Sequence, residues 1–143
     1  MVKTQFSHVA LVCPDPAAVE RFYSKHFGFV RTRVYDPGPG QVVMLMKDNM
    51  YLEVFPAEST SPAGTPTEAG PMYPCWRHIS FIVDDLDAAL AQIGSDAPIT
   101  LGPADLSGYV EGMRVAWLAD PAGNIVELNQ GYRDEDNPPP FEG

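Results

Sequence analysis

Two histidines and two glutamates stand at matching places in the two halves of this 143-residue sequence. His8 is followed 45 residues later by Glu53, and His78 is followed 49 residues later by Glu127. Each glutamate has apolar neighbours, so it should be largely buried, and a buried carboxylate needs a cation or several hydrogen-bond donors. Two imidazoles and two carboxylates together suit a borderline divalent metal ion. The four residues are therefore candidate ligands of one metal site.

The four residues belong to an internal repeat. A stretch at 56–74 contains five prolines and no periodic apolar pattern, which predicts a linker. The segments on its two sides carry the same order of signals, and each predicts a module of the form β-α-β-β-β. The expected fold class is therefore α+β in a single domain. It comprises a first module over about 4–56, a linker over 57–74, a second module over about 75–131 and a tail over 132–143.

Helix start and stop signals place the elements within each module. Asp15 can cap a helix that ends at Gly28, and Asp84 or Asp85 can cap a second helix that ends at Gly94. In this scheme each histidine lies in the middle of the first strand of its module, and each glutamate lies on the last strand. Strands are expected at 7–13, 29–35, 41–47 and 50–56, and then at 77–83, 98–102, 114–120 and 124–130.

Charge and composition argue against several classes of protein. Nine Lys+Arg against nineteen Asp+Glu give a formal net charge of −10, which disfavours binding to nucleic acid or to an anionic membrane surface. No apolar run approaches the roughly 18 residues of a membrane span, and no secretory signal is recognisable. Cys13 and Cys75 form neither a CxxC metal motif nor a disulfide framework. We therefore expect a cytoplasmic protein with no nucleic-acid or membrane partner.

Three segments resemble the vicinal oxygen chelate superfamily, which contains glyoxalase I, extradiol dioxygenases, methylmalonyl-CoA epimerase and the fosfomycin and bleomycin resistance proteins. The resemblance covers about residues 4–131, and its last segment contains a specific DPxGNxxEL pattern. It implies that the two modules form an incomplete barrel around a metal, with His8, Glu53, His78 and Glu127 as ligands. The segments are SHVALVCPDPAAVERFYSKHFGF, RHISFIVDDLDAAL and LADPAGNIVELNQ.

Two carboxylates among the implied ligands favour the glyoxalase I-like members. The resemblance implies an isomerase, lyase or epimerase that acts through an enediolate, with one divalent ion per chain (Zn, Ni, Co, Mn or Fe). Glu53 and Glu127 are then the candidate catalytic bases. Glyoxalase I typically has an arginine that helps to hold the glutathione carboxylate, and an asparagine is common after its first ligand glutamate. Val12 and Ala57 stand at these places, so we expect a small carbonyl substrate that is not linked to glutathione.

Two other classes of function remain open. One is an Fe(II) dioxygenase of the ring-cleaving type, in which His8, His78 and Glu127 form the ligand triad and Glu53 lies behind them. The other is a metal-free protein that binds a small molecule, as the resistance proteins do. A binding protein has no reason to keep four ligand-type residues.

Aromatic residues supply the possible substrate pocket. Period-2 alternation puts Tyr51 and Phe55 on the face of Glu53, and Phe6 on the face of His8. The loop at 102–113 is a possible lid with Tyr109 on it, and the tail carries Phe141 as a possible apolar anchor. The pocket candidates are Phe6, Tyr51, Phe55, Trp76, Tyr109 and Trp117.

An incomplete barrel leaves strand edges to cover, so we expect a homodimer.

Overall fold

The computed structural model describes residues 1–35 and 37–140. Two four-stranded sheets, each with one longer helix, repeat the same β-α-β-β-β order, as predicted. The first module contains β1 (His8–Cys13), α1 (Pro16–Phe27), β2 (Val30–Val34), β3 (Val43–Lys47) and β4 (Met50–Pro56). The second contains β5 (Ile79–Ile82), α2 (Leu86–Ile93), the short 3₁₀ helix η1 (Gly94–Asp96), β6 (Ile99–Asp105), β7 (Arg114–Ala119) and β8 (Ile125–Gln130).

The two sheets have equivalent topology and are not closed into a barrel. Their strand orders are β1-β4-β3-β2 and β5-β8-β7-β6. In each sheet the first and last strands of the module pair in parallel, and the remaining pairs are antiparallel. The first strand therefore lies at one edge of each sheet, directly beside the strand that carries the glutamate. The α+β class with paired modules is confirmed.

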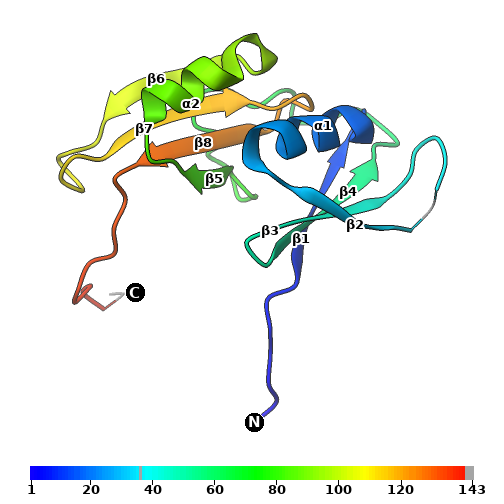
Figure 1. Ribbon diagram of the computed structural model, residues 1–143, viewed down its shortest axis with the longest axis horizontal. Helices are drawn as coiled ribbons and strands as arrows, with labels where there is room; N and C mark the ends of the chain where they lie inside the picture. The colour runs from blue at the N-terminus through cyan, green and yellow to red at the C-terminus, as the bar shows by residue number, and fades with distance from the viewer. Residues whose placement is uncertain (36, 141–143) are drawn as a thin grey trace.

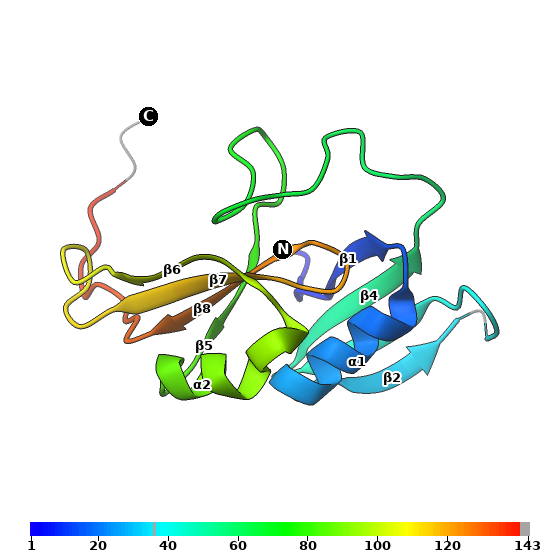
Figure 2. The ribbon, with the colours of Figure 1, turned by 90° about the horizontal axis from the view of Figure 1, so that it is seen from above.

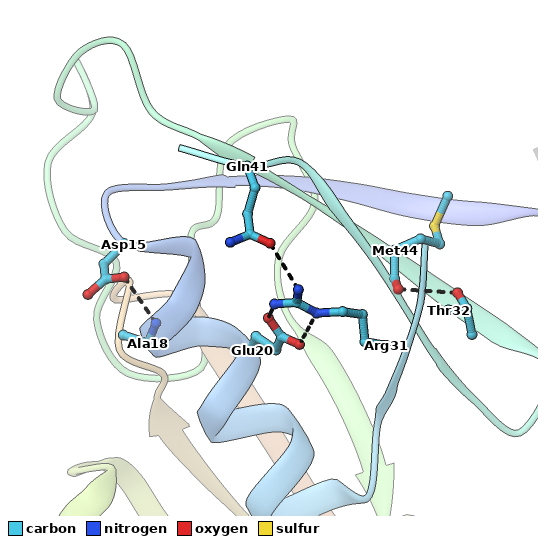
Figure 3. A network of polar contacts seen from close by, with 7 residues as sticks. All are labelled: Asp15, Ala18, Glu20, Arg31, Thr32, Gln41 and Met44. Atoms are coloured by element: carbon cyan, nitrogen blue, oxygen red, sulfur yellow. Dashed lines mark hydrogen bonds and ion pairs between the residues drawn. The ribbon is translucent and has the colours of Figure 1, made fainter. Parts of the chain in front are cut away.

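Both longer helices begin and end where the sequence predicts. The Asp15 side chain accepts a hydrogen bond from the Ala18 N–H at 3.1 Å, and α1 ends at Gly28, whose φ of 71° a glycine adopts at little cost. Asp85 rather than Asp84 caps α2. Figure 3 shows the first of these caps beside an ion pair that ties α1 to β2.

That ion pair joins the guanidinium of Arg31 to the carboxylate of Glu20. The Arg31 Nε donates to Glu20 Oε1 at 2.7 Å, and its Nη1 donates to the Gln41 side chain at 3.0 Å (Figure 3). Because the fork of Arg31 contacts both carboxylate oxygens, the contact fixes direction as well as distance. It holds the start of β2 against α1.

One hydrophobic core joins the two modules on the helix side of the sheets. The helices α1 and α2 lie on the same side of the two sheets, and the end of α1 lies beside the end of α2 (Figures 1 and 2). The rings of Phe27 and Phe81 stack with their centroids 4.1 Å apart. The side chain of His26 shares a hydrogen bond with Asp96 at 2.8 Å. The two modules therefore pack against each other through a shared core and are not joined by the linker alone.

A buried hydrogen bond strengthens this junction. The Tyr23 hydroxyl of α1 donates to Asp120 Oδ2 at 2.9 Å, and both residues are buried. Asp120 belongs to the DPxGN segment, and its other oxygen accepts from the backbone N–H groups of Ala122 and Asn124, each at 2.9 Å. Burial, with help from Asp120, raises the pKa of Tyr23 well above its usual value, so this phenol stays a donor. Asp120 therefore has two structural roles: it fixes the turn between β7 and β8, and it binds α1 of the first module to the second module.

Two expectations from the sequence need correction. Neither histidine lies in the middle of a strand, because His8 is the first residue of β1 and β5 begins only at Ile79. The lid segment is shorter than 102–113, because β6 runs on to Asp105 and only the turn after it remains outside the sheet. Phe141 lies outside the described residues. Among the residues that are described, no helix has the length and apolar character needed to cross a bilayer.

Candidate metal centre

The two histidine–glutamate pairs lie on the sheet faces that point away from the helices. In β1, Cys13 is buried in the core and Val12 is exposed, so alternation places His8 on the outer face. In β4 and β8 the neighbours of each glutamate pack into the core, which puts Glu53 and Glu127 on the same outer faces. In the register of the parallel pair, Tyr51 of β4 lies opposite His8 of β1. Glu53 lies two residues further along β4, on the same outer face as Tyr51.

The pair in the second module is closely held. His78 Nε2 lies 3.3 Å from Glu127 Oε2, and the two side chains are 21% and 16% exposed. The other ring nitrogen of His78, Nδ1, lies 2.8 Å from the carbonyl oxygen of Ala69. A carbonyl can only accept, so Nδ1 carries the proton and donates it. The second ring nitrogen, Nε2, is then the one left available for the carboxylate of Glu127 or for a metal ion.

The pair in the first module is more open. His8 Nε2 lies 3.9 Å from Glu53 Oε1, and the His8 side chain is 36% exposed. The Ser7 hydroxyl lies 2.8 Å from His8 Nδ1, and because a hydroxyl can donate or accept, it leaves the tautomer of His8 open.

The separations can be compared with the needs of a metal ion. Two ligand atoms at about 2.1 Å from one ion are about 3.0 Å apart at a right angle and about 3.4 Å apart at a tetrahedral angle. The 3.3 Å between His78 Nε2 and Glu127 Oε2 falls within that range. The 3.9 Å between His8 and Glu53 would have to shorten.

The structure brings the four residues together as two pairs rather than as one cluster. Within residues 1–35 and 37–140, no group of three or more His, Cys, Asp or Glu side chains is placed to hold a metal ion. A complete four-ligand site therefore needs either a rearrangement of one chain or the pairing of two chains.

The expected pocket residues lie in different surroundings. Trp117 is buried and donates from Nε1 to Glu127 Oε2 at 3.0 Å, so it touches the candidate site directly. Tyr51 and Phe55 are half-buried on the face of Glu53. Phe6, Trp76 and Tyr109 are exposed, the last two at 87% each.

Two hollows of the described structure lie elsewhere. Cavities of about 480 and 470 Å³ border the end of α1 and the strand β5, and His26 lines both. None of the four candidate ligands lines either cavity. The outer face of the second sheet is partly covered by the linker, because Ala69 packs there with Val115, Trp117 and Ile125.

Several residues that support the second pair were missed from the sequence. The linker carbonyl of Ala69 orients His78, and Gly70 makes this possible because a Cβ there would lie 2.4 Å from the Arg77 carbonyl oxygen. The Thr100 hydroxyl anchors the same stretch by donating to the Glu68 carbonyl at 2.6 Å. The sequence of this segment predicts only a linker, because proline and glycine content gives no sign of such tertiary contacts.

Comparisons with known proteins agree with the fold. The crystal structure of SMU.1112c is 26% identical, with a TM-score of 0.64 over 88% of this chain and 98% of that one. A mutant of the fosfomycin resistance protein FosX from Listeria monocytogenes, in complex with Mn(II) and 1S,2S-dihydroxypropylphosphonic acid, is 13% identical, with a TM-score of 0.65 over 92% and 93%. TnmS3, an antibiotic-binding protein from Streptomyces sp. CB03234, is 19% identical, with a TM-score of 0.62 over 92% and 99%.

Sequence comparison gives the family. The search of curated proteins found no significant match. A family model does match residues 5–128, which is most of the chain and includes all four candidate ligands. The chain belongs to the Glyoxalase/Bleomycin resistance protein/Dioxygenase superfamily.

Proposed function

We propose that this protein is a divalent-metal-dependent isomerase or lyase that acts on a small carbonyl compound with two adjacent oxygens. The metal ligands are His8, Glu53, His78 and Glu127. The observation that carries the proposal is the His78–Glu127 pair, in which an imidazole bonded through Nδ1 to the Ala69 carbonyl has its Nε2 3.3 Å from a carboxylate oxygen. The FosX mutant of the same fold, with Mn(II) bound, is consistent with metal binding by this chain.

The chemistry follows from such a site. A divalent ion there would bind both substrate oxygens and lower the pKa of the neighbouring C–H by stabilising the charge that develops. The chain itself supplies a carboxylate that takes the proton and returns it, and imidazoles that keep the site in place. Apolar side chains of β1 and β4, such as Val12 and Phe55, lie on the same outer face and would exclude water from one side of the substrate.

The surroundings of the first pair favour a substrate without glutathione. Val12 is exposed on the outer face, and it offers no charge to hold a carboxylate. The backbone N–H of Ala57 is already bonded to the Cys13 carbonyl at 2.9 Å. A neutral carbonyl compound carries no carboxylate, so it needs neither an arginine at the place of Val12 nor an asparagine at the place of Ala57.

A homodimer would complete the site. Each chain presents the closely spaced pair His78–Glu127 and the more exposed pair His8–Glu53. The strands β1 and β5 lie at sheet edges and carry the exposed side chains of Val12 and Ile82. If the first module of one chain faces the second module of its partner, each dimer contains two four-ligand sites.

Subunit mixing tests this arrangement. His8→Ala and His78→Ala chains each lack a ligand of every site, but a mixed dimer would contain one site with all four ligands. Random one-to-one mixing by refolding should therefore restore about a quarter of the wild-type metal content. No restoration would mean that both pairs of one site come from the same chain, and a light-scattering mass near 15.6 kDa would refute the dimer.

A second candidate function is metal-free binding of a small molecule. It is favoured by the lack of any ligand group larger than a pair within the described parts of one chain. The antibiotic-binding protein TnmS3 has the same fold. Metal analysis of protein purified without oxygen separates the possibilities, since Zn, Ni, Co or Mn supports the isomerase or lyase, iron the dioxygenase, and no metal the binding protein.

A further inference from the structure

We propose that the two cavities between the end of α1 and the strand β5 form a second ligand site, which takes a small neutral aromatic molecule with one hydroxyl group. The group that selects the hydroxyl is the imidazole of His26. Because none of the four candidate metal ligands lines either cavity, this site does not depend on the proposed function.

The two cavities adjoin each other. His26, Ile82 and Val83 line both of them. Their volumes of about 480 and 470 Å³ fall within the roughly 300–1,000 Å³ that is usual for small-molecule sites. A ligand of one or two fused rings fits either cavity.

Apolar side chains make up most of the lining of the larger cavity. The rings of Phe27, Phe29 and Phe81 lie there beside Leu52 and Ile79. Phe27 stacks on Phe81, and Phe29 meets Phe81 edge-on, with centroids 6.0 Å apart and planes at 84°. These contacts within the core hold the rings in place before a ligand binds, and a preformed aromatic lining favours an aromatic ligand.

His26 is the buried polar side chain of the lining. It is 1% exposed, and its Nε2 lies 2.8 Å from Asp96 Oδ2. The ammonium of Lys25 donates to the same oxygen at 2.6 Å, and the hydrogen bonds from Lys25 and His26 hold the pKa of Asp96 below its usual value. Asp96 is therefore a carboxylate at neutral pH and can only accept, so Nε2 of His26 carries the proton.

The other ring nitrogen of His26 is an acceptor without a donor. Nδ1 is buried, and it has no hydrogen-bond partner within residues 1–35 and 37–140. A buried polar atom that is left unpaired is costly, so a ligand that brings a hydroxyl to Nδ1 gains affinity. Since almost none of the ring is open to water in the free chain, the ligand must part the neighbouring side chains to reach it.

The charges around the cavities favour a neutral ligand over an anion. Lys47 lines the larger cavity, but its ammonium lies 3.4 Å from the carboxylate of Asp48, which lines it too. Asp84 and Asp85 line the other cavity. An anionic ligand would therefore meet acidic side chains and no free counter-charge among the described lining residues.

Two naphthalene probes test the selection of a hydroxyl. 2-Naphthol and 2-methoxynaphthalene have the same rings, but only the first has a donor. In fluorescence titrations the full chain should bind 2-naphthol about 3–10-fold more tightly, as expected for one hydrogen bond. His26→Phe should remove this preference without abolishing binding, and the anion 2-naphthoate should bind the wild-type chain more weakly than 2-naphthol. Equal wild-type affinity for 2-naphthol and 2-methoxynaphthalene, or binding of neither, would overturn the proposal.

Two matched tryptophan variants test the place of binding. Ile82 is 67% exposed and lines both cavities, so Ile82→Trp should fill them and weaken the binding of both probes. Val12 stands at the equivalent place of the first module, is 61% exposed and lines neither cavity. Val12→Trp should therefore leave the affinities unchanged, and equal losses in the two variants would refute the site.

The nitrogen-15 signals of the His26 ring test the hydrogen bond itself. In the free chain at pH 7, Nδ1 should give the signal of an unprotonated nitrogen. That signal should move when 2-naphthol binds and should stay when 2-methoxynaphthalene binds. A protonated Nδ1 in the free chain, or a signal that does not move at saturation with 2-naphthol, would overturn the proposal.

Discussion

Replacing Tyr23 by phenylalanine removes one hydroxyl from the junction between the modules. Asp120 is only 4% exposed. After the change, its Oδ2 keeps the hydrogen bond from the Asn124 side-chain amide at 3.2 Å but loses the one from the phenol. Losing a hydrogen bond to a charged group costs about 1.5–3 kcal/mol. For a chain of this size each kcal/mol lowers Tm by roughly 3 °C, so we expect Tyr23→Phe to lower Tm by about 5–9 °C. Thermal and urea unfolding at pH 7 measure the change.

Tyr132→Phe is the matched control. The Tyr132 hydroxyl also donates to an aspartate, Asp134, at 2.9 Å, but this pair is exposed. Exposed polar contacts contribute little, so the control should leave Tm almost unchanged. Equal effects of the two substitutions would refute the claim that the buried bond joins the modules.

The pH dependence of the Tyr23 effect gives a second check. The folded-state pKa of Tyr23 is raised above the unfolded value, so its contribution to stability is complete below about pH 10 and is lost as the pH rises further. The stability difference between wild type and Tyr23→Phe should therefore shrink above pH 10. A difference that grows with pH would contradict the assigned direction.

Three further predictions concern the linker, the thiols and the lid. Gly70→Ala should lower metal affinity about 10–100-fold by displacing the carbonyl behind His78. Gly64 also has a positive φ, but a Cβ there would meet open space, so calorimetry should show unchanged affinity in the control variant Gly64→Ala. Burial raises the pKa of Cys13 to about 11, so a disulfide reagent at pH 8 should modify exposed Cys75 rapidly and Cys13 only after unfolding. Tyr109→Ala should lower kcat/KM with metal content unchanged, and unaltered kinetics would exclude a lid.

Local signals in the sequence predicted most of the fold. Aspartate caps and terminal glycines act within a few residues, so the bounds of both longer helices could be predicted. The glutamate strands followed from their alternating pattern, and β4 has the predicted bounds.

Long-range packing explains what the sequence could not show. Strand pairing of β5 starts only at Ile79, because Gly70 packs on the Arg77 backbone and His78 bonds to the linker. The division of the site into two pairs depends on how the modules pack, and repeat symmetry alone does not contain that information.

Metal stoichiometry tests the central claim most directly. Protein purified without oxygen, and metal-free protein reloaded with single ions, would be analysed by mass spectrometry of the elements. We predict one divalent ion per wild-type chain and less than about a tenth of that in His78→Ala, since the loss of one ligand costs heavily in affinity. Full metal content in His78→Ala, or a wild-type chain that binds no ion, would contradict the account.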